Sequence, residues 1–387
     1  MVPFSLLFVT SLIQGVQCLS SGKASHNNNN PPNNNPKHKV PRPATPTSSF
    51  VATITTTTSP VHELILTRHG DSVWNGGQPG MLETFTGWTD VTLSDKGIQE
   101  AKDLGTQVAT YSYGIDACFT SVLQRAQLTA HHCLWAFDSQ PHTLAPQRYV
   151  VDYRLNERHY GQLQGMVKQH AEQNGIYDPR DVQAWRRSWH AVPPLLQDDD
   201  PRRVEELRKY LHYCGGSPEA VPRGESLAMV AQNRIRPFIE QVLTPVLNEA
   251  SVNGSGATGL IVAHANSLRA LIGVLCHVED DPASLQRLEA IKIPTGVPLV
   301  LRYRPCPKRP GRYQVCDIPG LDHTSSAKRP LPHLPLWPLS AIPRVRTPSS
   351  ILVPDMDASV NDAAVIGEKP RNLLSSGAAT SGTVRTL

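Results

Sequence analysis

The sequence predicts an α/β fold, a three-layer sandwich with a mainly parallel sheet. Two patterns predict it. Short apolar runs alternate with longer segments whose apolar residues recur every three or four positions, as strands and amphipathic helices do. One run, Gly259–Ala263 (GLIVA), is apolar throughout, which is typical of a strand buried on both faces. Ligands of such sheets bind beyond the carboxyl ends of the strands, so functional side chains are expected there.

The first half of the expected domain holds two strands and two helices. Glu63–Thr67 (ELILT) and Ile115–Thr120 (IDACFT) are short and mostly apolar, as strands are. A helix is expected after Ser94, whose hydroxyl can accept a hydrogen bond from an N–H of the first turn. Its apolar face consists of Ile98, Ala101, Leu104 and Val108. A second helix is expected over residues 123–134.

The second half continues the alternation. Arg148–Asp152 is expected to be a strand, and the buried strand Gly259–Ala263 leads into a helix over Asn266–Leu275. The N–H groups of that helix's first turn are expected to face a bound anion. Two further segments, Val297–Tyr303 and Tyr313–Asp317, can pair at an edge of the sheet.

Polar, proline-rich sequence flanks this alternation, so the folded domain is assigned to residues 61–320. Residues 1–20 contain an apolar stretch of signal-peptide length and form a signal-like targeting segment; a misassigned start codon is the plain alternative. Residues 21–60, built from Asn, Pro, Thr and Ser, are expected to be a disordered transit or linker segment. Residues 321–387 are expected to be a disordered Pro/Ser-rich tail.

The N-terminal segment predicts delivery to an organelle. It has four basic residues and no acidic one up to residue 62, and such a two-part leader resembles those that enter plastids bounded by extra membranes. A plastid, or another compartment reached through the endoplasmic reticulum, is favoured. A mitochondrion is the next choice, and the cytosol is expected if the leader is inactive.

Composition excludes several classes of protein. Between residues 63 and 320 there are 26 basic against 28 acidic residues, which argues against a nucleic-acid-binding domain. No apolar run reaches the roughly 18 residues of a membrane-spanning helix, so no membrane span is expected. The seven cysteines lack paired spacing, which argues against a disulfide scaffold or a zinc ribbon, and no other metal cluster emerges.

Two histidines follow two of the expected strands. The first strand ends at Arg68-His69-Gly70, and the buried strand is followed by His264. Each histidine alone is most simply a structural residue, but two at strand ends, one beside an arginine, indicate a site. A neutral imidazole is a good nucleophile toward phosphorus, and the anionic group it accepts needs fixed cations such as Arg68 and Arg125. The residues therefore point to phosphoryl transfer.

An ordered set of motifs resembles the cofactor-dependent phosphoglycerate mutases of the histidine phosphatase superfamily. The resemblance covers residues 63–302, almost the whole expected domain. The segments that carry it are LTRHGDSVWN, FTGWTDVTLS, TSVLQRA, LNERHYGQLQG, QAWRRS, AHANSLRA and IPTGVPLV. The first motif alone is shared with many phosphatases, but the ordered set is specific.

The resemblance implies roles for particular residues. His69 is the phosphorylated nucleophile, and Glu157 is the general acid/base for the substrate hydroxyl. The phosphoryl group is held by Arg68, Arg125, Asn75 and His264. The other substrate-binding residues are Gly70, Asp71, Ser72, Thr86, Gly87, Arg158, His159, Tyr160, Lys168, Arg186, Arg187, Ala265 and Asn266. Within that set, the basic residues between 158 and 187 and Tyr160 would clamp the second anionic end of the substrate.

The resemblance further implies the interconversion of 3-phosphoglycerate and 2-phosphoglycerate, primed by 2,3-bisphosphoglycerate without a metal. A phosphatase on the same fold and a non-catalytic binding protein are the alternatives. The family's bisphosphoglycerate-synthesising branch typically changes the glycine that is Gly87 here, which favours the mutase. Phosphoglycerates are the expected partners, and the sequence is compatible with a homo-oligomer.

The chain departs from the family pattern at four places. Asp71 replaces a usual Glu, and Ala265 replaces a usual Gly, which would be strained if the position required a positive φ. Residues 76–84 are about twice as many as the family usually has before Phe85, and Thr84 replaces a commonly basic residue. These departures bear on the rate and the binding geometry, not on the reaction class.

Overall fold

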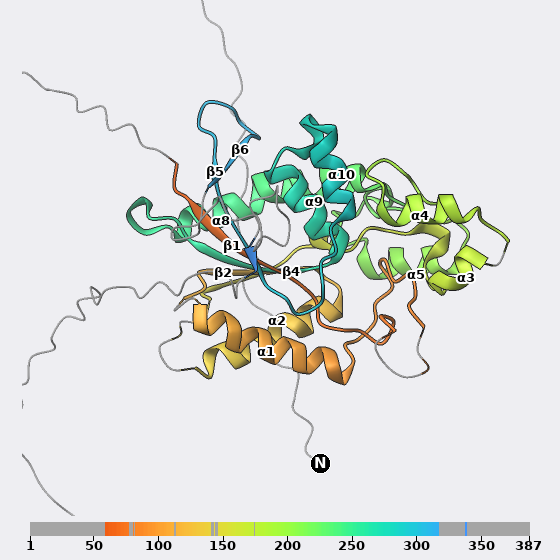
Figure 1. The fold of residues 1–387 in the computed structure, drawn as a ribbon, viewed down its shortest axis with the longest axis horizontal. Helices are drawn as coiled ribbons and strands as arrows, with labels where there is room; N and C mark the ends of the chain where they lie inside the picture. The colour runs from red at the N-terminus through yellow and green to blue at the C-terminus, as the bar shows by residue number, and fades with distance from the viewer. Residues whose placement is uncertain are drawn as a thin grey trace, which may run out of the picture. The chain divides into compact units, whose positions relative to one another are not determined.

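The computed structural model describes residues 59–76, 80, 82–111, 114–140, 143, 146–173, 175–316 and 337–338 (Figure 1). The expected targeting segment 1–20, all but the last two residues of segment 21–60, and all but Trp337 and Pro338 of the expected tail 321–387 lie outside these residues.

The described residues form a single mixed sheet. Its strands are β1 (His62–Arg68), β2 (Ala117–Thr120), β3 (Arg148–Val151), β4 (Thr258–Ala263), β5 (Leu299–Pro305), β6 (Tyr313–Cys316) and β7 (Trp337–Pro338). Among these strands the order is β3-β2-β4-β1-β5-β6, with β7 also paired to β5. The pairs β3/β2, β2/β4 and β4/β1 are parallel, whereas β5 is antiparallel to β1, β6 and β7. The predicted mainly parallel sheet is confirmed, and the two segments expected to pair at its edge do so, as β5 and β6.

The register of the parallel strands aligns their carboxyl ends. Arg68 of β1 lies opposite Ala263 of β4, and Thr120 of β2 lies opposite Val262 of β4. The next residue of each chain segment therefore emerges at the same edge of the sheet. These residues are His69, His264 and Ser121.

Helices cover both faces of the sheet, which makes the three layers. On one face, Ile65 packs with apolar residues of α1 (Asp95–Tyr111) and α2 (Gln124–Asp138). On the other, Leu64 and Leu66 pack with α9 (Ala265–Leu275), α10 (Pro282–Ala290) and residues 227–247. This alternation follows from the two-residue period of a strand, whose successive side chains point to opposite faces. Figure 1 shows α1 and α2 below the sheet and α8, α9 and α10 above it.

A nearly continuous helical segment over 227–250 contains two widened turns. It consists of α6 (Leu227–Val230), a π-helical turn Ala231–Ile235, α7 (Arg236–Phe238), a second π-helical turn Ile239–Leu243 and α8 (Thr244–Ala250). Each π turn ends two residues before a proline, Pro237 or Pro245. A proline has no N–H to donate and its ring crowds the carbonyl four residues earlier, so widening the preceding turn accommodates it.

Three short helices form a cap beside the carboxyl end of the sheet. They are α3 (Lys168–Gln173), α4 (Pro179–Arg187) and α5 (Pro201–Tyr210), and Figure 1 shows them together on one side of the domain. The described 3-10 turns are Tyr153–Leu155, Gly161–Leu163, Pro218–Ala220, Val252–Gly254 and Val278–Asp280. The cap has small apolar clusters of its own, one around Trp88 and Tyr210 and one around Phe85 and Leu163.

Strand β7 lies inside the segment that the sequence predicts to be a disordered tail. Trp337 and Pro338 pair antiparallel with Val300 and Leu299 of β5. A proline is tolerated there because this strand borders the sheet and need not donate on its outer side. Among the described residues no helix is both long and apolar enough to cross a bilayer.

Candidate active site

A cavity of about 340 Å³ opens at the carboxyl ends of β1 and β4, under the cap. Its cationic lining residues are Arg68, Arg125, Lys168, Arg186, Arg187, Arg269 and Lys292, and its acidic ones are Glu83 and Glu157. This excess of positive charge suits a ligand with several negative charges.

His69 is held in one tautomer. It follows β1, it is 4% exposed, and its Nδ1 lies 2.7 Å from the carbonyl oxygen of Gly70. A carbonyl only accepts, so Nδ1 carries the hydrogen, and in the neutral ring Nε2 keeps its lone pair. Burial, together with the charges of Arg125 and Arg68, holds the pKa of His69 well below its usual value. The imidazole is therefore neutral and nucleophilic at physiological pH.

His264 lies beside His69, with ring centres 5.0 Å apart. Its Nε2 is 2.8 Å from the hydroxyl of Ser121, the residue that follows β2. Burial and the charge of Arg125 hold the pKa of His264 well below its usual value. Its Nδ1 is buried and has no hydrogen-bond partner among the described residues, but His264 itself is not among the residues that line the cavity.

Two arginines near His69 form no ion pair with a described carboxylate. Arg125 donates to the carbonyl oxygens of Thr89 (2.9 Å) and Gly87 (2.8 Å), and Arg68 donates to that of Ile293 (3.3 Å). Burial lowers the pKa of Arg125 to about 10, which still leaves it charged at neutral pH. In each, Nε is buried without a described partner. The carbonyls fix the two cations in place without neutralising them, which suits them to bind an anion.

Gly70 and Asp71, which follow His69, pack against neighbouring parts of the protein and do not line the cavity. Gly70 packs so closely on the Gly97 backbone that a Cβ there would overlap the Gly97 carbonyl. The Asp71 carboxylate accepts a hydrogen bond from the Ser94 hydroxyl at 2.7 Å, which ties the segment to the start of α1. Among the predicted site residues, Gly70 and Asp71 thus hold the nucleophile's segment in place and do not line the cavity.

Asn75 lines the cavity, as predicted, and Ser72 orients it. The Asn75 Oδ1 accepts from the Ser72 backbone N–H (2.9 Å) and hydroxyl (2.5 Å). Its amide NH₂ is therefore the group left to donate to a ligand. Thr86 and Gly87 also line the cavity, as predicted.

Glu157 lines the cavity from a short segment after β3. Its Oε1 accepts from the backbone N–H of Arg158 at 2.8 Å and from that of Asn266 at 3.2 Å. The Asn266 N–H, expected to face a bound anion, thus serves a carboxylate instead. Ala265 is the first residue of α9 and is helical. The family usually has glycine here, but the strain that alanine would suffer at a positive φ does not arise.

The distal cations reach the cavity as predicted, but two of them carry carboxylate partners. Lys168 forms an ion pair with Glu83, and Arg186 pairs with Glu172 at 2.6 Å. Arg187 lines the cavity as well.

Tyr160 adds a phenol to this end of the cavity, where its hydroxyl accepts from the Asn266 side chain at 2.9 Å. Burial acts to raise the pKa of Tyr160, but the charges of Arg158 and Lys168 outweigh it and the pKa is lowered.

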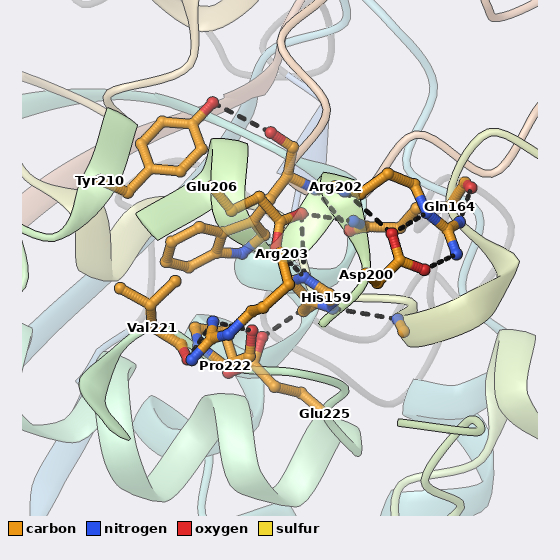
Figure 2. Close-up of polar contacts among 12 residues, drawn as sticks. His159, Gln164, Asp200, Arg202, Arg203, Glu206, Tyr210, Val221, Pro222 and Glu225 are labelled. Atoms are coloured by element: carbon orange, nitrogen blue, oxygen red, sulfur yellow. Dashed lines mark hydrogen bonds and ion pairs between the residues drawn. The ribbon is translucent and has the colours of Figure 1, made fainter. Parts of the chain in front are cut away.

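Besides Gly70, Asp71 and Ser72, two further predicted substrate-binding residues, Arg158 and His159, do not line the cavity. The Arg158 guanidinium lies 4.8 Å from the centre of the Tyr160 ring, on which it stacks. The His159 ring is wholly buried in the network of Figure 2, where Nδ1 accepts from the Gly161 N–H and Nε2 donates to Glu206 at 2.9 Å. Both ring nitrogens of His159 are therefore used inside the protein, and neither is free to contact a substrate.

Sequence reasoning missed three charged lining residues, Arg269, Lys292 and Glu83. Arg269 donates to Asn266 Oδ1 at 2.5 Å and to the Ile291 carbonyl at 2.7 Å, and burial lowers its pKa to about 10. The signal for it was present, because Arg269 is three residues after Asn266 on the same helix and such residues share a face. No comparable signal marked Lys292 or Glu83. Among the described residues no cluster of three His, Cys, Asp or Glu side chains is placed to hold a metal.

Three comparisons relate the chain to known proteins. Residues 64–204 match the family model of the histidine phosphatase superfamily (branch 1). The chain is 40% identical over 240 residues to a 2,3-bisphosphoglycerate-dependent phosphoglycerate mutase of Haemophilus ducreyi, covering 62% of this chain and 94% of the relative. The relative of the same description in Neisseria meningitidis serogroup B is 39% identical over 241 residues, with the same coverage. Among solved structures, a mycobacterial glucosyl-3-phosphoglycerate phosphatase is similar at 19% identity and a TM-score of 0.46, covering 66% of this chain and 97% of that one.

Proposed function

The chain belongs to the histidine phosphatase superfamily, and from this premise we propose that it interconverts 3-phosphoglycerate and 2-phosphoglycerate through a phosphohistidine at His69. The observation that carries the proposal is the fixed tautomer of His69. Its Nδ1 is committed to the Gly70 carbonyl, so the Nε2 lone pair is available between the two arginine cations. Relatives of about 40% identity that carry the mutase name support the choice of substrate.

His69 is charged when its Nε2 lone pair forms a P–N bond to one phosphoryl group of a doubly phosphorylated glycerate, while the P–O bond to the glycerate oxygen breaks. The electron pair stays on that oxygen, which takes a proton from the Glu157 carboxyl. In the transfer step the free hydroxyl of bound 3-phosphoglycerate gives its proton to Glu157 and attacks the phosphorus, and the P–N electrons return to Nε2. The doubly phosphorylated glycerate then gives its other phosphoryl group to His69, which leaves 2-phosphoglycerate. Arg68, Arg125 and His264 stabilise the charge on the phosphoryl oxygens throughout.

The donor set of the cavity fits 2,3-bisphosphoglycerate as the primer. Three arginines that line the cavity each keep a buried N–H donor without a described partner: Arg68 Nε, Arg125 Nε and Arg269 Nε. When bound there, 2,3-bisphosphoglycerate supplies the phosphoryl group that charges His69. Its second phosphate and its carboxylate would be held by Lys168, Arg186 and Arg187 at the distal end.

That distal cluster favours a mutase over a phosphatase. A phosphatase needs one phosphate site and access for water, whereas a mutase must retain a polyanionic intermediate while it turns over. The ion pairs of Lys168 and Arg186 with carboxylates favour a phosphatase instead, because they reduce the positive charge that is available to retain that intermediate.

Steady-state kinetics with 3-phosphoglycerate decide between the two. We expect isomerisation that is stimulated by 2,3-bisphosphoglycerate, unaffected by EDTA and abolished in His69→Ala. Release of inorganic phosphate faster than isomerisation would establish the phosphatase, and substantial isomerisation by His69→Ala would exclude the phosphohistidine route.

A further inference from the structure

A buried ion pair lies behind the segment that carries Glu157. Arg234 donates to three backbone carbonyl oxygens of that segment: those of Arg154 (3.4 Å), Asn156 (2.8 Å) and Glu157 (3.2 Å). Three acceptors from one short stretch of chain meet a single guanidinium, whose donors are fixed in a plane. The segment after β3 is therefore held in one conformation by a residue that does not line the cavity.

Glu225 fixes the direction of that guanidinium. Its two carboxylate oxygens accept from Arg234 Nε and Nη2, both at 2.8 Å, and both side chains are 4% exposed. Glu225 also brackets the far end of the segment, because its carboxylate accepts from the His159 N–H and its own N–H donates to the His159 carbonyl, each at 2.9 Å. Figure 2 shows Glu225 close to His159. Arg234 and Glu225 together hold residues 154–159 through hydrogen bonds to their backbone.

The Glu157 carbonyl accepts a hydrogen bond from a second donor, which holds the segment further. The indole N–H of Trp88 reaches it at 2.8 Å, and the Arg234 guanidinium lies 5.6 Å from the centre of the Trp88 ring. The peptide of Glu157 is thus held from two sides. At the other end of the residue, the carboxylate meets the N–H groups of Arg158 and Asn266.

The helical context aims Arg234 at the segment. Arg234 lies in the π-helical turn Ala231–Ile235, which ends two residues before Pro237. A π turn rotates and displaces its side chains relative to a regular helix, and such turns recur at functional sites.

We propose that the Arg234–Glu225 pair is a positioning pair for proton transfer by Glu157, which places its carboxylate at the substrate oxygen that leaves or attacks phosphorus. This rests on the proposed role of Glu157 as general acid/base. Removing these hydrogen bonds lets the segment shift. General acid/base catalysis is then lost, because the acid no longer reaches the oxygen that it protonates. Binding of the phosphoryl group by Arg68 and Arg125 does not depend on the pair.

The test compares two phosphoryl donors that give the same product. In single-turnover experiments with the full chain, His69 is labelled from 2,3-bisphosphoglycerate, whose leaving alkoxide needs a proton, or from acetyl phosphate, whose leaving acetate needs none. Arg234→Lys keeps the charge opposite Glu225 but loses the planar fork that spans the carbonyls. We expect it to slow labelling from 2,3-bisphosphoglycerate roughly tenfold or more and to leave labelling from acetyl phosphate nearly unchanged.

Two further variants make the outcomes distinct. Glu157→Gln should show the same selectivity with a larger loss, about 10²–10⁴-fold. Arg236→Lys, two residues away and paired at the surface with Glu279, should change neither rate. If Glu157→Gln is selective but Arg234→Lys slows both donors equally or neither, the positioning role is wrong. If Glu157→Gln is not selective, or 2,3-bisphosphoglycerate does not label His69 while acetyl phosphate does, the proposed function itself fails.

Discussion

At the scale of single residues, the low pKa values of the two active-site histidines have a consequence for stability. Burial, helped by Arg125, depresses the pKa of both His69 and His264 in the folded state. Below the ordinary histidine value of 6.5 the unfolded chain takes up protons that the folded chain does not. The stability present above pH 6.5 is therefore lost as the pH falls from 6.5 toward the depressed folded values.

The size of that loss can be checked by removing one histidine. Each contributes up to about 1.4 kcal/mol of unfolding free energy per pH unit in this window. His69→Asn should therefore flatten the fall in unfolding free energy below pH 6.5, as measured by urea titration at several pH values. A pH dependence identical to that of the wild type would show that His69 is not held neutral.

Glu83 makes a second residue-level prediction. Burial acts to raise its pKa, but Lys168, Arg186 and Arg68 outweigh it, so the pKa is lowered and the carboxylate is ionised at neutral pH. The Glu83 carboxylate neutralises part of the positive charge at the distal end of the cavity, which an anionic substrate needs for binding. Glu83→Gln should tighten binding of 2,3-bisphosphoglycerate roughly tenfold, about 1.4 kcal/mol, in calorimetric titration.

The matched control for this variant is Glu205→Gln, an exposed carboxylate on α5 paired with Arg208. It should leave the affinity unchanged. Weaker or equal binding by Glu83→Gln would mean that Glu83 holds Lys168 in the binding position instead of competing for it.

Residue identities near the nucleophile could be predicted from sequence because strand ends and motif order place them. His69, Arg125 and Glu157 all reach the cavity as expected. Which way a side chain turns beside them could not be predicted. His159 follows Glu157 by two residues, yet its ring turns inward, because the buried Glu206 carboxylate and the Gly161 N–H satisfy both of its nitrogens. Such partners are distant in sequence and become visible only in the fold.

At the scale of elements, the packing of α1 on α2 depends on one glycine. A Cβ at Gly105 would overlap the backbone carbonyl of Cys133 and crowd Ala136, and the main chain of a helix cannot yield as a flexible side chain can. Alanine gains about 1 kcal/mol in helix propensity over glycine, but overpacking costs typically about 1–3 kcal/mol. Gly105→Ala should therefore lower the unfolding free energy, measured by urea denaturation.

Thr106→Ala is the control on the same helix, because Thr106 is exposed and its hydroxyl makes only a long hydrogen bond, 3.4 Å, to the Lys102 carbonyl. It should be neutral or slightly stabilising. A Gly105→Ala protein at least as stable as the wild type would show that the two helices are free to separate.

The strands and the helices α1, α2 and α9 were predictable because their apolar periods are regular. The cap helices α4 and α5, and α10 on the sheet, were missed, although a signal existed: each begins with an aspartate that caps the helix and a proline at its first position. The segment over 227–250 was harder to predict. Pro237 and Pro245 look like helix breakers, and only the widened turns that precede them let the helical segment continue.

At the scale of the whole molecule, we propose that residues 1–60 direct the precursor to an organelle, with a plastid or another compartment entered through the endoplasmic reticulum as the destination. Their apolar start and acid-free, hydroxyl-rich continuation support this. Residues 1–62 fused to a fluorescent protein should give an organellar signal and a shortened product. A diffuse cytosolic signal with an uncut N-terminus would refute it.

The central claim is that the Nε2 atom of His69 carries the phosphoryl group between the two positions of the glycerate. Its most direct measurement is to incubate the chain with radiolabelled 2,3-bisphosphoglycerate, identify the labelled residue and isomer by mass spectrometry and alkaline hydrolysis, and then chase with unlabelled 3-phosphoglycerate. The account predicts an acid-labile, alkali-stable phosphate on Nε2 of His69 that passes to phosphoglycerate faster than to water. A phosphate on Nδ1, on another residue, or retained in His69→Ala would contradict it.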